Sequence, residues 1–231
     1  MVRRCVALDR KLKKVRNLYE FFTENIYMNK ISFSLLIFVT ALSIFSCADL
    51  RPKPAEPPEP VDKKPQMPVY IMGKGMVSAE KMASFLLKSN SRADSAFVNS
   101  LAKIYIEEAA FEGVNHDIAF SQMCLETGFL RFGGDVKPEQ YNFCGLGAIG
   151  NGEPGNSFSE PRIGVRAHIQ HLKAYGSEEP LNGKLESPRF RFVKRGIAPT
   201  YEGLTGTWAM DKQYAVKIKS IIERLYEFAF Y

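Results

Sequence analysis

The sequence lacks a general excess of positive charge outside its first residues. The 231 residues have a formal net charge of +6, but residues 1–46 account for +5 of it and residues 47–231 for only +1. A nucleic-acid-binding protein needs a basic face, because phosphate contacts supply much of its affinity. The nearly neutral body of the chain therefore excludes nucleic acid as the expected partner.

The chain also has no apolar run of the roughly 20 residues that a membrane-spanning helix needs. Its longest candidate, residues 31–44, follows a short polar start and ends just before Cys47, which is the layout of a secretory signal peptide. Residues 42–47, Leu-Ser-Ile-Phe-Ser-Cys, resemble a bacterial lipobox, in which the cysteine becomes the lipidated first residue of the mature protein. The run is therefore interpreted as a targeting signal.

Residues 1–47 are accordingly predicted to be a leader with a lipoprotein-type signal peptide, and Met28 is a candidate for the true start. Lipidation of Cys47 would anchor the protein to a membrane of a bacterial cell envelope, facing the periplasm or the exterior. Plain secretion and an uncleaved anchor are the alternatives.

Proline is concentrated directly after the leader. Residues 51–68 contain 7 of the 13 prolines of the chain. Because proline fixes φ and removes a hydrogen-bond donor, residues 48–68 are predicted to form an extended linker. A ligand for a proline-binding module is the weaker alternative. The folded domain is expected to span residues 69–231.

Cysteine and histidine are scarce, with four and three residues. His168 and His171 lie three apart on a predicted helix, but no acidic or cysteine ligand accompanies them to complete a tetrahedral zinc set. We therefore expect no metal site and no cofactor. Beyond the leader only Cys124 and Cys144 remain, and in an oxidising compartment they can form a disulfide. Two buried free thiols are equally compatible with the sequence.

Apolar residues recur at helical spacing in five segments of the domain. Ser78 and Asp211 are predicted N-caps, and Gly113 is predicted to end a helix. The five expected helices cover about residues 79–90, 94–112, 116–127, 160–176 and 211–228.

One segment of the domain is rich in glycine. Residues 133–157 contain Asn-Gly and Pro-Gly pairs, which favour turns and predict a small β-hairpin lobe. No internal repeat is present. The expected fold class is α+β and predominantly α, with one central helix and a minor β lobe.

The helix at residues 116–127 is apolar on almost every side, which is typical of a helix in the middle of a fold. Its polar sector consists of Gln122 and Glu126, four residues apart. Glu126 lies in the last turn, where the helix dipole disfavours negative charge, and apolar neighbours add desolvation. Both effects raise the carboxyl pKa towards the range of a general acid. The alternative is a solvated Glu126 or one paired with Arg131.

The order of motifs around this helix resembles the glucosaminidase family of peptidoglycan hydrolases. The resemblance rests on residues 107–129, which include Glu126-Thr127-Gly128, on Asn142-Phe143-Cys144-Gly145-Leu146, and on residues 208–218. It covers about residues 76–226. It implies a lysozyme-like fold and a catalytic domain that hydrolyses the β-1,4 bond between N-acetylglucosamine and N-acetylmuramic acid.

The resemblance implies that Glu126 protonates the leaving oxygen. A second carboxylate is not defined by any motif: Glu153 is the first choice because it lies on the Gly-rich loop, and Glu160 and Asp135 are alternatives. The acetamido group of the sugar can replace such a carboxylate. An oxocarbenium-like transition state requires one or the other.

Substrate-binding roles are expected for five residues, some with a core-packing alternative. Tyr214 can hold the sugar or pack in the last helix, and Trp208, the only tryptophan, can stack on a pyranose ring or be buried. The five residues are Gln122, Asn142, Phe143, Trp208 and Tyr214.

The expected partners are the glycan strands of peptidoglycan and, through the lipid anchor, a membrane. Two rival functions stay open: a non-catalytic peptidoglycan-binding lipoprotein, and a lytic transglycosylase that uses one glutamate and forms 1,6-anhydro sugars. The sequence sets no expectation for the oligomeric state.

Overall fold

The segments with helical periodicity form five α-helices in the computed structural model, which describes residues 65–150 and 152–231. The helices are α3 (Ala79–Ser89), α4 (Ser95–Glu112), α5 (His116–Glu126), α6 (Pro161–Gly176) and α7 (Tyr214–Phe230), with three short 3-10 helices, η1 (Pro138–Gln140), η2 (Phe190–Phe192) and η3 (Tyr201–Leu204). The described residues belong to one compact unit, Lys63–Tyr231. The predicted leader with Cys47, and residues 48–64 of the predicted linker, lie outside them. Among the described helices, none has the length and apolar character needed to cross a bilayer.

The predicted caps fix the ends of the first two helices. Ser78 Oγ accepts a hydrogen bond from the Lys81 N–H at 3.4 Å, and Asp94 Oδ1 accepts one from the Phe97 N–H at 2.6 Å. Gly113 ends α4 in the left-handed conformation, with φ +75°, which glycine adopts without steric cost. The predictions for Ser78 and Gly113 are confirmed, and Asp94 caps the start of α4 in addition.

The predicted start of the last helix is wrong by three residues. Helix α7 begins at Tyr214, and Gln213 is its N-cap. Asp211 Oδ1 instead accepts from the Gln213 N–H two residues on, at 2.9 Å. This is an Asx turn, a local hydrogen bond that competes with helix capping.

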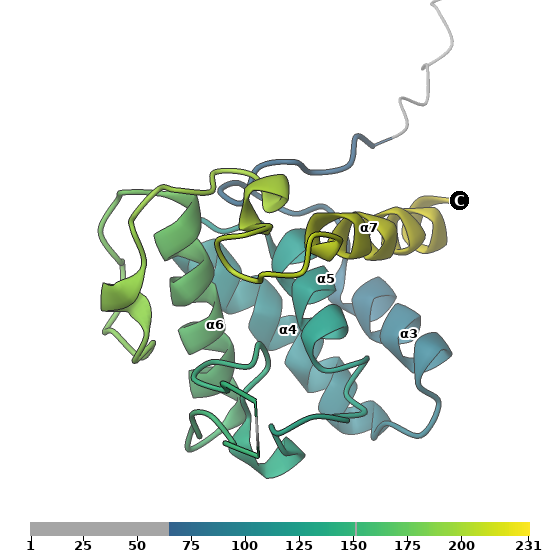
Figure 1. Cartoon of the computed structure of the whole chain (residues 1–231). Helices are drawn as coiled ribbons and strands as arrows, with labels where there is room; N and C mark the ends of the chain where they lie inside the picture. The colour runs from purple at the N-terminus through teal and green to yellow at the C-terminus, as the bar shows by residue number, and fades with distance from the viewer. Residues whose placement is uncertain (1–64, 151) are drawn as a thin grey trace, which may run out of the picture. The chain divides into compact units, whose positions relative to one another are not determined.

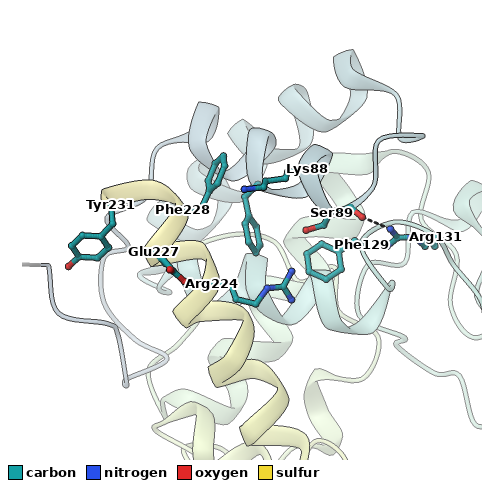
Figure 2. A pocket seen from close by; sticks show the side chains of 9 residues that line it. Lys88, Ser89, Phe129, Arg131, Arg224, Glu227, Phe228 and Tyr231 are labelled. Atoms are coloured by element: carbon teal, nitrogen blue, oxygen red, sulfur yellow. Dashed lines mark hydrogen bonds between the residues drawn. The ribbon is translucent and has the colours of Figure 1, made fainter.

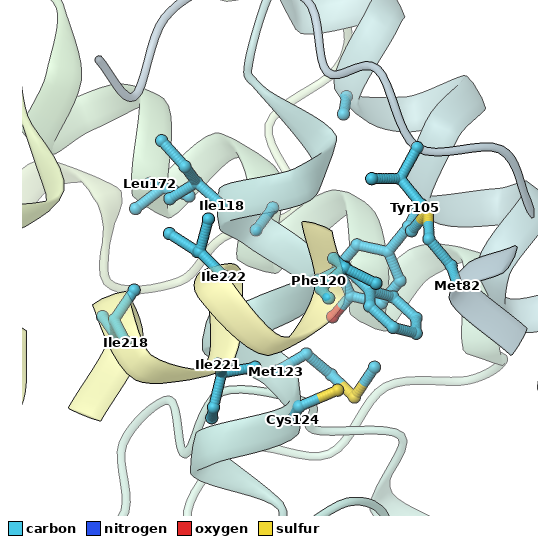
Figure 3. Packing of buried hydrophobic residues seen from close by; sticks show 14 of the residues in the cluster. Met82, Tyr105, Ile118, Phe120, Met123, Cys124, Leu172, Ile218, Ile221 and Ile222 are labelled. Atoms are coloured by element: carbon cyan, nitrogen blue, oxygen red, sulfur yellow. The ribbon is translucent and has the colours of Figure 1, made fainter. Parts of the chain in front are cut away.

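Helix α5 occupies the middle of the fold, as predicted. Figure 1 shows α4 and α5 between α3 on one side and α6 on the other, with α7 running across them, and α7 packs against both α5 and α3. In Figure 3, Ile218, Ile221 and Ile222 of α7 lie in the same buried cluster as Ile118 and Met123 of α5. The apolar stripes of the outer helices therefore converge on a central helix that is buried over most of its length.

The N-terminal end of α5 is held by a buried carboxylate. Asp117 is 0% exposed and accepts hydrogen bonds from the N–H groups of Met76 and Val77 at 2.7 and 3.2 Å. The hydroxyl of Tyr226 on α7 donates to Asp117 Oδ2 at 2.8 Å. The carboxylate thus ties α5 to α7 and to the segment that precedes α3.

The predicted β-hairpin lobe is not found: the described part of residues 133–157 contains turns, η1 and the single bridge Gly150–Glu153, but no strand. The side chain of Asn142 makes the hydrogen bonds to the Leu146 backbone that a neighbouring strand would otherwise make. Its Oδ1 accepts from the Leu146 N–H and its Nδ2 donates to the Leu146 carbonyl, both at 2.9 Å. Five glycines with positive φ interrupt any extended run: Gly145, Gly147, Gly150, Gly152 and Gly155. The described residues are therefore predominantly helical, without a sheet.

Candidate active site

Glu126 is the last residue of α5, and the chain turns sharply after it. The Phe129 N–H donates to the Cys124 carbonyl at 2.8 Å, and the Thr127 hydroxyl donates to the Met123 carbonyl at 2.8 Å. These bonds satisfy carbonyl groups at the helix end and fix its direction. Glu126 itself stays accessible to solvent. The turn therefore presents the carboxylate at the surface of the central helix.

The predicted alternative of a Glu126–Arg131 ion pair is not formed. The Arg131 guanidinium donates instead to the carbonyls of Gly128, at 3.0 Å, and Ser89. Glu126 is thus available to other partners.

Two donors from the C-terminal part of the chain reach one oxygen of Glu126. Trp208 Nε1 donates to Glu126 Oε1 at 3.1 Å, and the Tyr214 hydroxyl donates to the same Oε1. Tyr214 is the first residue of α7, and Trp208 lies in the segment between η3 and α7. The packing of α7 on α5 therefore brings Glu126 next to two residues that lie 82 and 88 positions later in the chain.

Burial of the Glu126 carboxyl raises its pKa above the ordinary value of 4.5, and the hydrogen bonds from Tyr214 and Trp208 oppose this rise without cancelling it. The carboxyl is therefore partly desolvated by the protein around it, although Glu126 as a residue is exposed to solvent. The predicted direction of the shift is confirmed, with desolvation as the main cause. A proton is held more strongly there than on an ordinary glutamate, as a general acid requires.

The second oxygen of Glu126 faces the segment that follows Asn142. A Cβ added to Gly145 would lie 3.8 Å from Glu126 Oε2, and Gly145 has φ +69°. Asn142 shapes this segment through its two hydrogen bonds to Leu146. The backbone at Gly145, without a side chain, thus leaves space beside Oε2.

Three of the five residues expected to bind substrate have side chains that are buried in the domain. Gln122 is 0% exposed, and Asn142 and Phe143 are 1% exposed. Asn142 braces the backbone, Phe143 packs edge-on against Tyr105, and Gln122 donates to the Tyr214 hydroxyl at 2.9 Å. These side chains support the site from within the core.

Trp208 and Tyr214 each combine the two alternatives that the sequence allows, a polar group at the site and a ring packed in the protein. The Tyr214 ring is buried in the core cluster while its hydroxyl reaches Glu126. Trp208 is half-buried, with its ring 5.0 Å from that of His171 and 5.2 Å from that of Tyr175. The aromatic packing fixes the orientation of its N–H.

The three candidates for a second carboxylate lie in or next to the Gly-rich segment. Asp135 Oδ1 accepts from the Gly152 N–H at 3.2 Å. Glu153 is exposed on the turn that begins at Gly150, and Glu160 is exposed at the N-cap of α6. The described residues include no hydrogen bond between any of these three carboxylates and the side chains that contact Glu126.

Both cysteines of the domain are buried free thiols, so the disulfide alternative is not formed. Burial raises the pKa of both thiols, and the negative charge of Glu126 raises that of Cys144 further. Cys144 therefore lies near Glu126 as a neutral thiol. It contributes an apolar wall rather than a nucleophile.

Within residues 65–150 and 152–231, no cluster of potential ligands suits a metal ion. His168 is fully buried and His171 is nearly so. Burial lowers the pKa of His168 to about 3 and that of His171 to about 4, so both are neutral. Both histidines pack against aromatic rings, and their hydrogen bonds are buried.

Sequence reasoning did not identify the partnership between His168 and Gln122, whose Nε2 and Oε1 atoms lie 3.0 Å apart. The two residues are 46 positions apart, and only the packing of α6 beside α5 brings them together. The only indication in the sequence is that both residues are polar and lie on helix faces that are otherwise apolar.

A pocket lies at the other end of α7, away from these groups. Figure 2 shows it between α3, α7 and the turn after α5, with Lys88, Arg131, Arg224 and Phe228 among its lining residues. Neither Glu126 nor its two donors lines it. The candidate active site is thus the accessible carboxylate at the end of α5.

Comparison with known proteins places this geometry in context. The family model Glucosaminidase, described as mannosyl-glycoprotein endo-beta-N-acetylglucosaminidase, matches residues 102–227, which include Glu126, Trp208 and Tyr214. An uncharacterized protein of Borreliella burgdorferi is 46% identical over 168 residues, which are 73% of this chain and 82% of that protein. No solved structure matches the chain.

Proposed function

The chain belongs to the glucosaminidase family, and from this membership and the geometry at Glu126 we propose that it is a peptidoglycan hydrolase with a lysozyme-like catalytic domain. It cleaves the β-1,4 bond between N-acetylglucosamine and N-acetylmuramic acid. The observation that carries the proposal is an accessible carboxyl with a raised pKa, held by Tyr214 and Trp208. Such a group can protonate the oxygen of a leaving sugar.

The two oxygens of Glu126 have different roles in this mechanism. Oε1 accepts from both Tyr214 and Trp208, so its lone pairs are occupied. The transferable proton therefore sits on Oε2, beside Gly145. The glycosidic oxygen of the substrate is placed within hydrogen-bond reach of Oε2, in the space that the missing side chain of Gly145 leaves open.

Proton transfer converts Glu126 into a carboxylate, and the same two donors stabilise the new charge. Hydrogen bonds to an ionised acceptor are stronger than those to a neutral one. The donors therefore favour the state after proton transfer more than the state before it, which lowers the barrier. The resulting carboxylate can then accept a proton from the attacking water.

Positive charge on the sugar requires compensation on its other side. Glu153 is the proposed protein group because its exposed turn is flanked by glycines and can approach a bound glycan. Substrate assistance by the acetamido group is the alternative. Trp208, half-buried beside Glu126, provides an aromatic face for a pyranose ring.

A lytic transglycosylase is the second candidate function. It is favoured by the observation that, in the described part of the chain, Asp135, Glu153 and Glu160 make no hydrogen bond to the side chains that contact Glu126. Such an enzyme needs one glutamate and releases 1,6-anhydro sugars instead of reducing ends. A binding protein without turnover is the third possibility to test.

We also propose that lipid on Cys47 tethers the domain to a cell-envelope membrane, with the proline-rich residues 48–68 as spacer. The tether confines the enzyme to glycan strands within reach of that membrane.

The test uses the full-length protein, purified in detergent and incubated with peptidoglycan, with Glu126→Gln as the matched control. Mass spectrometry of the soluble fragments identifies the new chain ends. Reducing N-acetylglucosamine supports the proposal. Reducing N-acetylmuramic acid indicates a muramidase, 1,6-anhydro ends indicate a transglycosylase, and binding without fragments indicates a binding protein.

A further inference from the structure

A row of buried hydrogen bonds extends from Glu126 into the centre of the domain. The Tyr214 hydroxyl donates to Glu126, and Gln122 Nε2 lies 2.9 Å from the Tyr214 hydroxyl. Gln122 Oε1 lies 3.0 Å from His168 Nε2, and His168 Nδ1 lies 2.9 Å from the Tyr105 hydroxyl. The row crosses α7, α5, α6 and α4 in turn. We refer to Tyr105, His168, Gln122 and Tyr214 as the relay.

The bonds of the relay all run in one direction. Burial keeps His168 neutral, with a pKa of about 3, so its ring carries one N–H. Because the carbonyl oxygen of Gln122 can only accept, that hydrogen is on Nε2, and Nδ1 accepts from Tyr105. The Gln122 amide then donates to Tyr214, whose single proton is left for Glu126. Each member donates towards the carboxylate.

Burial favours this one direction of the hydrogen bonds over the reverse. Tyr105, Gln122 and His168 are each 0% exposed, so water does not replace a lost partner. An unpaired polar group in the core is costly, which penalises a reversed amide or a rotated hydroxyl. Successive hydrogen bonds with the same direction also polarise one another and strengthen the last one.

We propose that His168 and Gln122 are positioning residues for Glu126, which direct the Tyr214 proton onto Oε1 and so leave Oε2 to carry the transferable proton. This inference rests on the proposed function. Neither residue touches the substrate, since both are fully buried. The relay determines which oxygen of the acid is free to react.

The competing explanation is purely structural, because the relay also links four helices. A structural role lowers stability and changes activity only as far as the folded fraction falls. A positioning role lowers kcat of the fully folded protein, with little change in KM, because it acts on the reacting oxygen and not on substrate binding. The two explanations therefore differ in the kcat of folded variants.

The test compares His168→Leu with His168→Gln in the full-length protein. Leucine has no donor for Gln122 Oε1, whereas the amide of glutamine can place an N–H near the position of His168 Nε2. Expected results are a kcat at least 10-fold lower for His168→Leu, a KM within about 2-fold of the parent, and recovery of most of the kcat in His168→Gln. Tyr226→Phe is the matched control, since it removes a buried hydroxyl that bonds Asp117 and lies outside the relay.

Gln122→Met is the second variant, and it tests the proposal if His168→Leu does not fold. Methionine is about as long as glutamine but has no N–H to donate to Tyr214 and no carbonyl oxygen to accept from His168, so the relay is interrupted. A kcat at least 10-fold lower is again expected.

The outcomes separate the two proposals. One outcome is that the parent hydrolyses glycan, that Glu126→Gln is inactive, and that the folded relay variants have the same kcat as Tyr226→Phe. This outcome overturns the positioning role, while the proposed function stands. If the parent releases no glycan fragment, the proposed function fails and the positioning role fails with it.

Discussion

Trp208 Nε1 lies 3.1 Å from Glu126 Oε1, although 82 positions of sequence separate the two residues. This contact holds the acid at the end of the central helix against the segment that leads into α7. It also divides the carboxyl into an occupied oxygen and an open one.

Replacement of Glu126 by glutamine is expected to lower kcat for peptidoglycan hydrolysis by about 10²–10⁴-fold, because the amide cannot donate an acidic proton. The amide oxygen can still accept from Tyr214 and Trp208, so the fold is retained. The midpoint of thermal unfolding at pH 7 should equal or slightly exceed that of the parent, since burial disfavours the charge on Glu126. A folded Glu126→Gln protein with parental activity would show that the acid lies elsewhere, with Glu153, Glu160 and Asp135 as the next candidates.

Activity is expected to disappear as the pH rises through the pKa of Glu126, because the general acid must be protonated. Burial raises that pKa, and the hydroxyl of Tyr214 lowers it in part. Tyr214→Phe removes this opposing effect, so the alkaline limb of the kcat/KM profile should shift to higher pH. Profiles of the parent, Tyr214→Phe and Tyr226→Phe test this; a shift to lower pH in Tyr214→Phe contradicts the assigned hydrogen bond.

Gly145→Ala is expected to reduce activity far more than its effect on stability explains. The left-handed φ of +69° costs alanine about 1–2 kcal/mol, and the added methyl enters the space 3.8 Å from Glu126 Oε2. Gly113→Ala is the control, because it has a similar φ of +75° at the end of α4. Both variants should unfold at similar urea concentrations, but only Gly145→Ala should lose hydrolysis. Equal activity of the two would place the reacting space elsewhere.

Lys173→Met is expected to destabilise the domain by about 3–5 kcal/mol, because it leaves the buried carboxylate of Glu112 without its cation. The two charged groups are 3.0 Å apart and almost fully buried. Lys219→Met removes the exposed pair with Glu223 and should cost about 1 kcal/mol or less. Urea unfolding of the two variants provides the comparison.

The same buried pair predicts loss of stability in acid. Burial raises the pKa of Glu112, but hydrogen bonds from Asn182, Lys173 and Gly183 outweigh it, and the net pKa lies below 4.5. A lowered folded-state pKa stabilises the domain above pH 4.5, and this contribution is lost as the pH falls through the folded-state value. The free energy of unfolding should therefore decrease below pH 4.5, and less steeply in a Glu112→Gln, Lys173→Met double variant.

Cys47→Ala is expected to move the protein from the detergent phase to the soluble fraction in a phase-partition experiment. The proposed lipid is then absent, while the described domain does not involve Cys47. Thermal unfolding of the domain should stay unchanged. Membrane partition equal to that of the parent would contradict lipid attachment.

Local sequence signals predicted the helices well, because caps and stops act within a few residues. Ser78, Asp94 and Gly113 fix helix ends through contacts that a sequence displays directly. Asp211 was misleading because the same side chain can cap a helix or close an Asx turn. The hairpin prediction failed for a related reason: glycine pairs specify turns but not the strands on either side of them.

The site was only partly predictable. Glu126 was identifiable from its place at the end of an apolar helix and from family resemblance, as were Trp208 and Tyr214 from resemblance. The sequence did not reveal that Gln122 is buried, because a polar residue on a buried helix can face either substrate or another polar residue. Its partner His168 is on another helix, and only tertiary packing determines that contact.

The order of the site residues along the chain determines when, during synthesis and folding, the site can become active. Glu126 is synthesised before Trp208 and Tyr214, which lie 82 and 88 positions later in the chain. A nascent chain that ends between Glu126 and Trp208 thus contains the proposed acid but neither of its donors. Under the proposed function, the hydrolytic site is complete only after α7 has docked on α5, so the order of folding delays activity until the whole domain has been made.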